Sequence, residues 1–201
     1  MRAKKPEMAK AGASGVRGGA GEHDRYFVAV LPPGVIAQEV ERIQQIFADH
    51  FASCGALRSP PHITLQPPFE WPAAEREWLE DCLLNFADKQ PRFVVALSGF
   101  AAFPPRVIYI DVVANAALEA LQISLAERFE RVLGVVERSR SRRYVPHMTV
   151  AFRDLTQENF ARAWPQFKDR PLSMEFAVHR LTLLMHGGGR WQVCKEFALQ
   201  P

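Results

Sequence analysis

The sequence contains only three cysteines, no long apolar run and little net charge, and each shortage excludes a class of protein. Cys54, Cys82 and Cys194 are odd in number and widely spaced, so they predict neither a disulfide framework nor a Cys-x-x-Cys metal site, and we expect buried thiols. No apolar run approaches the roughly 20 residues that cross a bilayer. The net charge of +3 over 201 residues favours a local anion site over a surface that coats nucleic acid.

Residues 1–24 have no apolar stretch of the kind that a secretory signal requires. They are rich in Gly, Ala and Lys without periodicity, which predicts a flexible tail, although an arginine-bearing, alanine-rich start is also compatible with an organelle transit peptide. Hydrophobic residues make up 48% of the chain and aromatic residues 10%, enough for residues 25–201 to bury a substantial core. We expect a cytoplasmic protein of one domain.

The order of predicted elements occurs twice in the chain. Strand, helix, strand, helix and strand are predicted over about 25–102 and again over about 106–185, and a glycine turn at 187–189 then leads into a last strand. The opening strands are about 80 residues apart. A duplication of this kind predicts two lobes, about 25–102 and 106–198, related by a pseudo-twofold axis.

Each half contains the motif Arg-x-x-Pro-His-apolar-Thr-apolar, first as RSPPHITL and, 85 residues later, as RYVPHMTV. Side chains two residues apart share a face of a strand, so His62 and Thr64 point the same way, and so do His147 and Thr149. The proline before each histidine favours an extended strand start. Two lobes related by a twofold axis would therefore present two histidines and two hydroxyls to one cleft.

These residue types suit the chemistry of a phosphate ester. Histidine has the side-chain pKa nearest neutrality, so a pair can hold one proton and lack another, which supplies an acid and a base. Two threonine hydroxyls can hold the nonbridging oxygens of a phosphate. A single histidine in a strand is more often structural, but two copies of the whole motif at equivalent places favour a shared function. The pattern predicts in-line displacement at phosphorus without a covalent intermediate.

The paired motifs, in their longer contexts SPPHITLQPPFEW and YVPHMTVAF, and the late HGGGRW resemble the two-histidine (2H) phosphoesterase superfamily. That superfamily includes bacterial 2′-5′ RNA ligase-like proteins and RNA 2′,3′-cyclic phosphodiesterases. The resemblance covers residues 25–198 and implies an α+β, bilobal fold with two antiparallel sheets around a central cleft and helices on the outside. It also implies metal-independent hydrolysis without a cofactor, with His62 as proton donor, His147 as acceptor, and Thr64 and Thr149 completing the catalytic set.

Basic and aromatic residues beside the motifs are candidates for substrate binding. Two arginines each lie four residues before a motif histidine and a third follows the second motif, so they can contact phosphates. A run of arginines over residues 138–143 makes the preceding loop basic. Two aromatic residues near the motifs can stack a base, although aromatic residues in such positions more often belong to the core. The candidates are Arg58, Arg143, Arg153, Phe69 and Tyr144.

Three function classes stay open at this point. The leading one is a hydrolase that converts 2′,3′-cyclic phosphates of RNA or nucleotides to 2′-phosphates. The second is 2′-5′ RNA ligation or 2′-5′ phosphodiester cleavage, and the third is a nucleotide- or RNA-binding module without turnover, which the intact His and Thr at both motifs disfavour. His179 and His186 lack partners at ligand spacing, so we expect no metal site. A duplicated cleft is complete in one chain, which predicts a monomer with no obligate protein partner and no membrane association.

Overall fold

The computed structural model describes residues 22–136 and 143–201, so the predicted tail up to residue 21 and Arg138, Arg140 and Arg142 lie outside the described residues. The strands are β1 (His23–Val30), β2 (Ile63–Pro72), β3 (Phe93–Phe103), β4 (Val107–Val112), β5 (His147–Ala151), β6 (Ser173–Val178), β7 (Arg180–Gly187) and β8 (Arg190–Ala198). The helices are α1 (Gly34–Phe51), α2 (Arg76–Ala87), α3 (Ala116–Arg128) and α4 (Gln157–Phe167), with short helical turns η1 (Gly55–Arg58), η2 (Ala73–Glu75) and η3 (Phe129–Leu133). The predicted α+β class is confirmed.

The eight described strands form one antiparallel sheet in the order β6-β3-β4-β5-β2-β1-β7-β8. The expectation of two separate sheets is therefore corrected to one continuous sheet. The junction is the pairing of Ile63 on β2 with Met148 on β5. β5 begins directly after Pro146 and β2 begins two residues after Pro61, so the pairing lies at the start of both strands.

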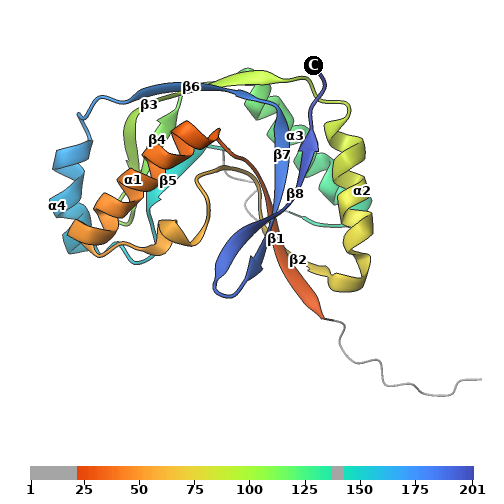
Figure 1. Ribbon diagram of the computed structural model, residues 1–201, viewed down its shortest axis with the longest axis horizontal. Coiled ribbons are helices and arrows are strands. Elements are labelled where there is room, and N and C mark those ends of the chain that lie inside the picture. Colours follow the sequence, from red (N-terminus) through yellow and green to blue (C-terminus); the bar gives the residue numbers. More distant parts are fainter. Residues whose placement is uncertain (1–21, 137–142) are drawn as a thin grey trace, which may run out of the picture.

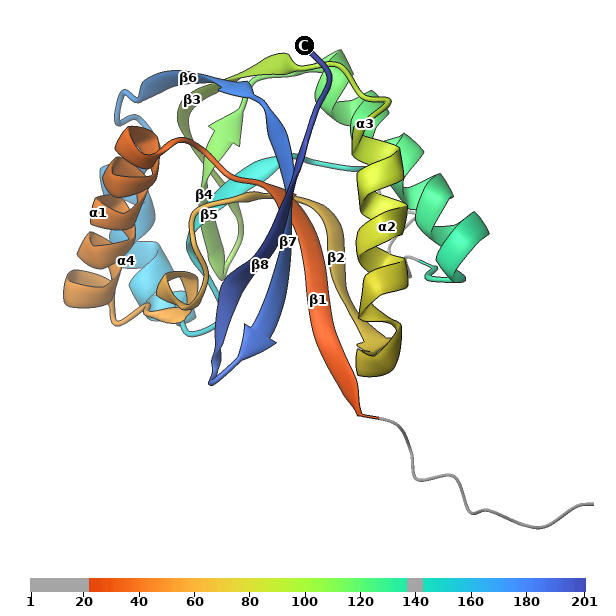
Figure 2. The ribbon, with the colours of Figure 1, turned by 45° about the vertical axis from the view of Figure 1, so that its right-hand side comes forward.

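Strands from the two halves of the sequence are interleaved in the sheet. β3, from the first half, pairs with β4 and β6 of the second half, and β7, near the C-terminus, pairs with β1. Figure 1 shows the sheet curling between two groups of helices, with α1 and α4 together at one side and α2 and α3 at the other. The same grouping is seen from the second viewpoint in Figure 2.

Alternating burial along the strands determines which face of the sheet the helices cover. Ile63 and Leu65 of β2, and Met148 and Val150 of β5, are buried in the main hydrophobic core together with the apolar stripes of the helices. α1 packs against β5 and α3 packs against β2, so each helix covers the motif strand of the other half. The opposite face, which carries the side chains at positions 62, 64, 147 and 149, is called the open face below.

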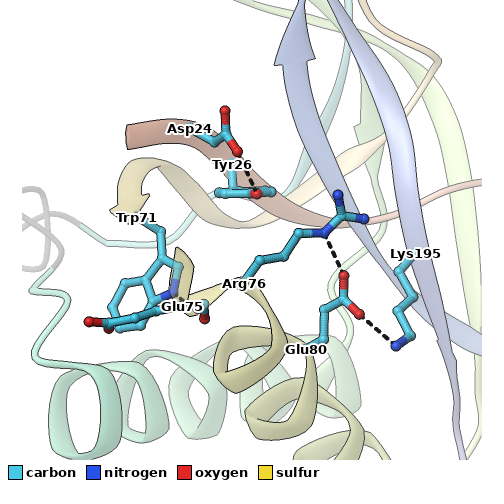
Figure 3. Close-up of polar contacts among 7 residues, drawn as sticks. All are labelled: Asp24, Tyr26, Trp71, Glu75, Arg76, Glu80 and Lys195. Atoms are coloured by element: carbon cyan, nitrogen blue, oxygen red, sulfur yellow. Dashed lines mark hydrogen bonds and ion pairs between the residues drawn. The ribbon is translucent and has the colours of Figure 1, made fainter. Parts of the chain in front are cut away.

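A polar network attaches α2 to the C-terminal strand β8 (Figure 3). Glu80 of α2 accepts hydrogen bonds from Arg76, one turn earlier, and from Lys195 of β8, both at 2.7 Å. At the start of the helix, the indole of Trp71 donates to the backbone carbonyl of Glu75. The network therefore supports the outer strand pair of the sheet from the helix side.

The three cysteines are free thiols, but they differ in exposure. Cys82 is buried in α2 and Cys194 is partly buried in β8, whereas Cys54 is exposed. The expectation of a buried thiol is wrong for Cys54, because this residue lies in the turn that joins α1 to η1. Among the described helices, none is long and apolar enough to cross a membrane.

Candidate active site

The register between β2 and β5 brings the two motifs side by side on the open face. Because the central apolar residues Ile63 and Met148 lie opposite each other in an antiparallel pair, the histidine of each motif lies across from the threonine of the other. All four side chains are partly exposed, although the apolar residues between them are buried. The resulting group consists of His62, Thr64, His147 and Thr149.

Each motif histidine forms the same hydrogen bond. Nδ1 of His62 lies 2.7 Å from the carbonyl oxygen of Pro60, and Nδ1 of His147 lies 2.7 Å from that of Val145. A carbonyl oxygen only accepts, so Nδ1 carries the hydrogen and donates it in both cases. The remaining ring nitrogen, Nε2, is then the atom that can take up or release a proton on each side of the site.

The surroundings of the two rings favour the neutral form of both histidines. Burial lowers the pKa of His62 to about 4, the bond to the Pro60 carbonyl opposes this shift, and the positive charge of a protonated His147 adds to it. Burial also lowers the pKa of His147, against the effect of the Val145 carbonyl. Because the two imidazoliums repel, the pair takes up its two protons in separate steps, and a bound phosphate anion would favour the first.

Aromatic rings surround the two histidines differently. The ring centroid of His147 lies 5.1 Å from that of Tyr109 and 5.2 Å from that of Phe103, whereas His62 contacts Phe27 at 4.8 Å. Asp111 of β4 is the direct strand partner of His147. Sequence reasoning missed these residues, although Asp111, between the buried residues Ile110 and Val112, indicates that this strand has a second, less buried face.

Two buried glutamines hold the motif strands from the helix-covered side. Gln44 of α1 donates from Nε2 to the carbonyl of Thr149 at 3.0 Å, and Gln122 of α3 donates to the carbonyl of Leu65 at 3.4 Å. Both amides are buried, Gln44 with 2% and Gln122 with 7% of its surface exposed. Each helix is thus hydrogen-bonded to the backbone of the motif strand that it covers, which fixes the position of that strand on the core.

Comparison with known proteins identifies the family. A model of the 2′-5′ RNA ligase superfamily matches residues 32–190. The chain belongs to this superfamily. A protein of Geobacillus kaustophilus that is provisionally named a phosphoesterase is 28% identical over 176 residues, 86% of this chain and 95% of that protein. One from Bacillus pumilus, named in the same way, is 31% identical over 144 residues, 70% and 80% of the two chains.

Solved structures of two bacterial proteins share the fold of this superfamily member. The crystal structure of TT0787 of Thermus thermophilus matches with a TM-score of 0.67 at 21% identity and covers 87% of this chain and 97% of that chain. The crystal structure of Escherichia coli LigT with 3′-AMP matches with a TM-score of 0.66 at 23% identity and covers 90% and 100%. The predicted resemblance to the 2H phosphoesterases is confirmed.

The three arginines predicted to bind substrate are all exposed and lie next to the motifs in this superfamily member. Arg58 ends η1, Arg143 is three residues before Pro146, and Arg153 follows β5. Arg153 has a φ of 67°, a left-handed conformation that costs energy in a residue with a Cβ. The next residue, Asp154, accepts hydrogen bonds from the Ser53 hydroxyl and the Cys54 amide, which anchors this turn. Their role in phosphate binding stays a prediction.

The two aromatic candidates, in contrast, contact the core. Phe69 packs against Phe129 with ring centroids 5.3 Å apart and lies opposite the core residue Tyr26, so it is on the helix-covered face. The hydroxyl of Tyr144 donates to the carbonyl of Thr64 at 2.9 Å, which ties the approach to the second motif to the first motif strand. These positions support structural roles for both residues and do not support base stacking.

Proposed function

We propose that the chain is a metal-independent phosphodiesterase that hydrolyses 2′,3′-cyclic phosphates of RNA ends or nucleotides to 2′-phosphates. The observation that carries the proposal is the arrangement of the two motif imidazoles. Each Nδ1 is bonded to a carbonyl, and each Nε2 has no hydrogen bond among the described residues. Each imidazole lies across from the threonine of the other motif. The superfamily and the names of the relatives support the reaction class. The complex of E. coli LigT with 3′-AMP supports a nucleotide substrate.

In the proposed reaction the phosphate lies between the two histidines. Nε2 of one neutral imidazole removes a proton from water as its oxygen attacks phosphorus, and Nε2–H of the other, protonated imidazole gives its proton to the departing 3′ oxygen. The P–O3′ bond breaks, the 2′ ester remains, and the pair has exchanged its protonation states. Thr64 and Thr149 donate to the nonbridging oxygens, where negative charge increases in the transition state. The resemblance assigns the donor role to His62 and the acceptor role to His147.

A second candidate is the same chemistry at a 2′-5′ linkage, which the description of the matching family model favours. If an RNA 5′-hydroxyl replaces water as the attacking group, the cyclic phosphate is joined to a second strand. If a linear 2′-5′ diester is bound instead, the same acid and base cleave it. These reactions need the same four residues, so the substrate distinguishes them.

The test is hydrolysis of adenosine 2′,3′-cyclic phosphate and of a short RNA with a 2′,3′-cyclic end, in excess EDTA. We expect wild-type turnover to survive EDTA and the product to be the 2′-phosphate. His62→Ala and His147→Ala should each lose roughly 10²- to 10⁴-fold in kcat, the usual contribution of an acid or base. His50→Ala, at an exposed histidine of α1, is the matched control and should retain full activity.

Three outcomes contradict the proposal: loss of activity in EDTA, activity retained by both motif variants, or a 3′-phosphate product. A parallel reaction with added 5′-hydroxyl RNA and with a 2′-5′-linked dinucleotide tests the second candidate. A joined or cleaved 2′-5′ product with no cyclic-phosphate hydrolysis would replace the first candidate with the second.

A further inference from the structure

The β7–β8 hairpin extends the open face on the side of His62 and carries a tryptophan there. Gly187 pairs with Arg190, so residues 188–189 form a two-residue turn, and both are glycines with the positive φ that only glycine adopts without strain. In this register His186 lies directly opposite Trp191. The turn therefore fixes the two rings as neighbours, with centroids 5.0 Å apart.

Two ring contacts connect this tryptophan to the first motif histidine. The indole of Trp191 meets Phe27 at 4.7 Å, edge to face, and Phe27 in turn meets the imidazole of His62 at 4.8 Å. Phe27 is buried with Ala29 and Leu184 in a small apolar cluster separate from the main core. Trp191 packs on this cluster but remains partly exposed, so its ring is a surface of the open face.

Positive charge lies next to the indole. The guanidinium of Arg25 lies over the Trp191 ring, 5.7 Å from its centroid, and forms no salt bridge with a described residue, although Glu70 is its strand partner. Arg190, at the hairpin tip, donates from Nη2 to the carbonyl of Leu57 in η1 at 3.2 Å. This bond attaches the hairpin to the segment that leads into the first motif, so the tryptophan is held in place relative to His62.

We propose that Trp191, with His186 and Arg25, forms a platform that binds the base of a nucleoside-bearing phosphodiester. The inference rests on the proposed function, and it narrows the substrate class to diesters that carry a nucleobase on the His62 side of the phosphate. In a nucleotide the ribose lies between the base and the phosphate, and in this site the ring of Phe27 lies between the indole of Trp191 and the imidazole of His62. One nucleotide can therefore place its base on the indole and its phosphate at the imidazole. Exposed aromatic rings beside a cation are the surfaces on which unpaired bases stack, with little preference among bases.

A different role for Trp191 makes a different prediction. If the indole only supports Phe27, and through it His62, its removal weakens turnover of every substrate alike. If it binds a base, its removal affects only substrates that have one. The comparison therefore uses adenosine 2′,3′-cyclic phosphate and glycerol 1,2-cyclic phosphate, which share the five-membered cyclic diester, whereas the glycerol ester has neither the ribose nor the base.

The experiment measures kcat and KM for both esters with wild type, Trp191→Ala, Trp191→Phe and Trp78→Ala. Trp78 is 57% exposed on α2 and serves as the matched control. We expect Trp191→Ala to raise KM for the adenosine ester about tenfold or more, the usual loss for one stacked base, with kcat/KM for the glycerol ester within about twofold. Trp191→Phe should retain most of the preference for the base, and Trp78→Ala all of it.

Binding of 2′-AMP and of inorganic phosphate, measured by calorimetry, gives a readout that does not require turnover. Trp191→Ala should weaken the binding of 2′-AMP by the same factor and leave the binding of phosphate unchanged. An equal loss for both esters, unchanged kinetics with both, or 2′-AMP binding unaffected by the variant would overturn the platform. If wild type hydrolyses neither ester, the proposed function fails, but the binding of 2′-AMP still tests whether Trp191 binds a base. If wild type does not bind 2′-AMP, the platform is overturned as well.

Discussion

At the scale of single residues, the bond from Nδ1 to a carbonyl two residues earlier determines what each motif histidine can do. It fixes the ring orientation and leaves Nε2 for proton exchange in both strands. In the proposed reaction one ring is the acid and the other the base, so the two copies must differ in protonation. Their surroundings already differ: His62 contacts Phe27, whereas His147 contacts Tyr109 and Phe103.

The pH dependence follows from the lowered pKa values. Burial lowers the pKa of His62 to about 4 and also lowers that of His147, so both lie below the ordinary value near 6.5 in the free protein. In the proposed reaction the active form holds one proton on the pair, and kcat/KM reports the free enzyme. We therefore expect a bell-shaped kcat/KM profile with its maximum below pH 6.5, measured with adenosine 2′,3′-cyclic phosphate.

The profile of kcat should have its maximum at a higher pH than that of kcat/KM, because a bound phosphate anion favours the protonated imidazole. Residual activity of His147→Ala should show only one limb of the bell, since one titrating group is gone. A kcat/KM maximum above pH 7.5, or a flat profile from pH 4 to 8, would contradict the assignment of both histidines to proton transfer.

Motif residues could be identified from the sequence because period-two alternation alone places His62 and Thr64 on one face of a strand. Their neighbours could not, since these come from strands distant in the chain. Asp111 reaches His147 through the β4–β5 register, and Trp191 approaches His62 through Phe27. Proximity in sequence does not distinguish a substrate contact from a structural one for Tyr144, whose hydroxyl bonds to the first motif strand.

At the scale of elements, the features that depend on neighbouring residues, such as helices and tight turns, could be predicted from the sequence. The buried residues Val40, Ile43 and Phe47 of α1 recur at helical spacing in the sequence, and the predicted glycine turn joins β7 to β8. The last strand of the second repeat, predicted to end near residue 185, is instead two strands, β6 and β7, which pair with different partners and are separated by His179. The pairing of strands depends on contacts between residues distant in sequence, so it cannot be predicted from hydrophobic periodicity.

The contact of α2 with β8 gives a prediction at this scale. Burial alone would raise the pKa of Glu80, but the hydrogen bonds from Lys195 and Arg76 outweigh it, and the pKa is lowered. A pKa lower in the folded state than in the unfolded state stabilises the fold above the unfolded value of about 4.3, and this stabilisation is lost as pH falls through the folded value. Glu80→Gln should therefore lower the Tm at pH 7 by about 2–4 °C, as followed by circular dichroism.

The matched control is Glu39→Gln, which breaks the more exposed pair with Arg42 on α1 and should shift the Tm by no more than about 1 °C. The difference between Glu80→Gln and wild type should shrink when the melts are repeated near pH 3, which is below the unfolded pKa of about 4.3. An undiminished difference at that pH would show that packing of the side chain, and not its charge, holds α2 on β8.

At the scale of the whole molecule, helices and strands of each half of the sequence pack against strands of the other half. α1 covers the motif strand β5, α3 covers β2, and β3 leaves its own half to pair with β4 and β6. The repeated order of elements could be predicted from the sequence, but the pairing between the halves could not, because a fold with separate halves has the same local pattern. The consequence for function is that the site forms where the two halves meet, at the pairing of Ile63 with Met148.

This pairing between the halves predicts that neither half folds alone. A fragment of residues 22–103 would leave β3 without both of its partner strands and β1 without β7, exposing long apolar edges. We expect fragments 22–103 and 104–201 each to lack a cooperative thermal transition by circular dichroism, and an equimolar mixture refolded from denaturant to regain one. The mixture should also regain the proposed phosphodiesterase activity, since each fragment supplies one His-Thr motif. A fragment that melts cooperatively by itself would show that the halves are independent lobes, and the interleaved pairing would then not be what holds the two motifs together.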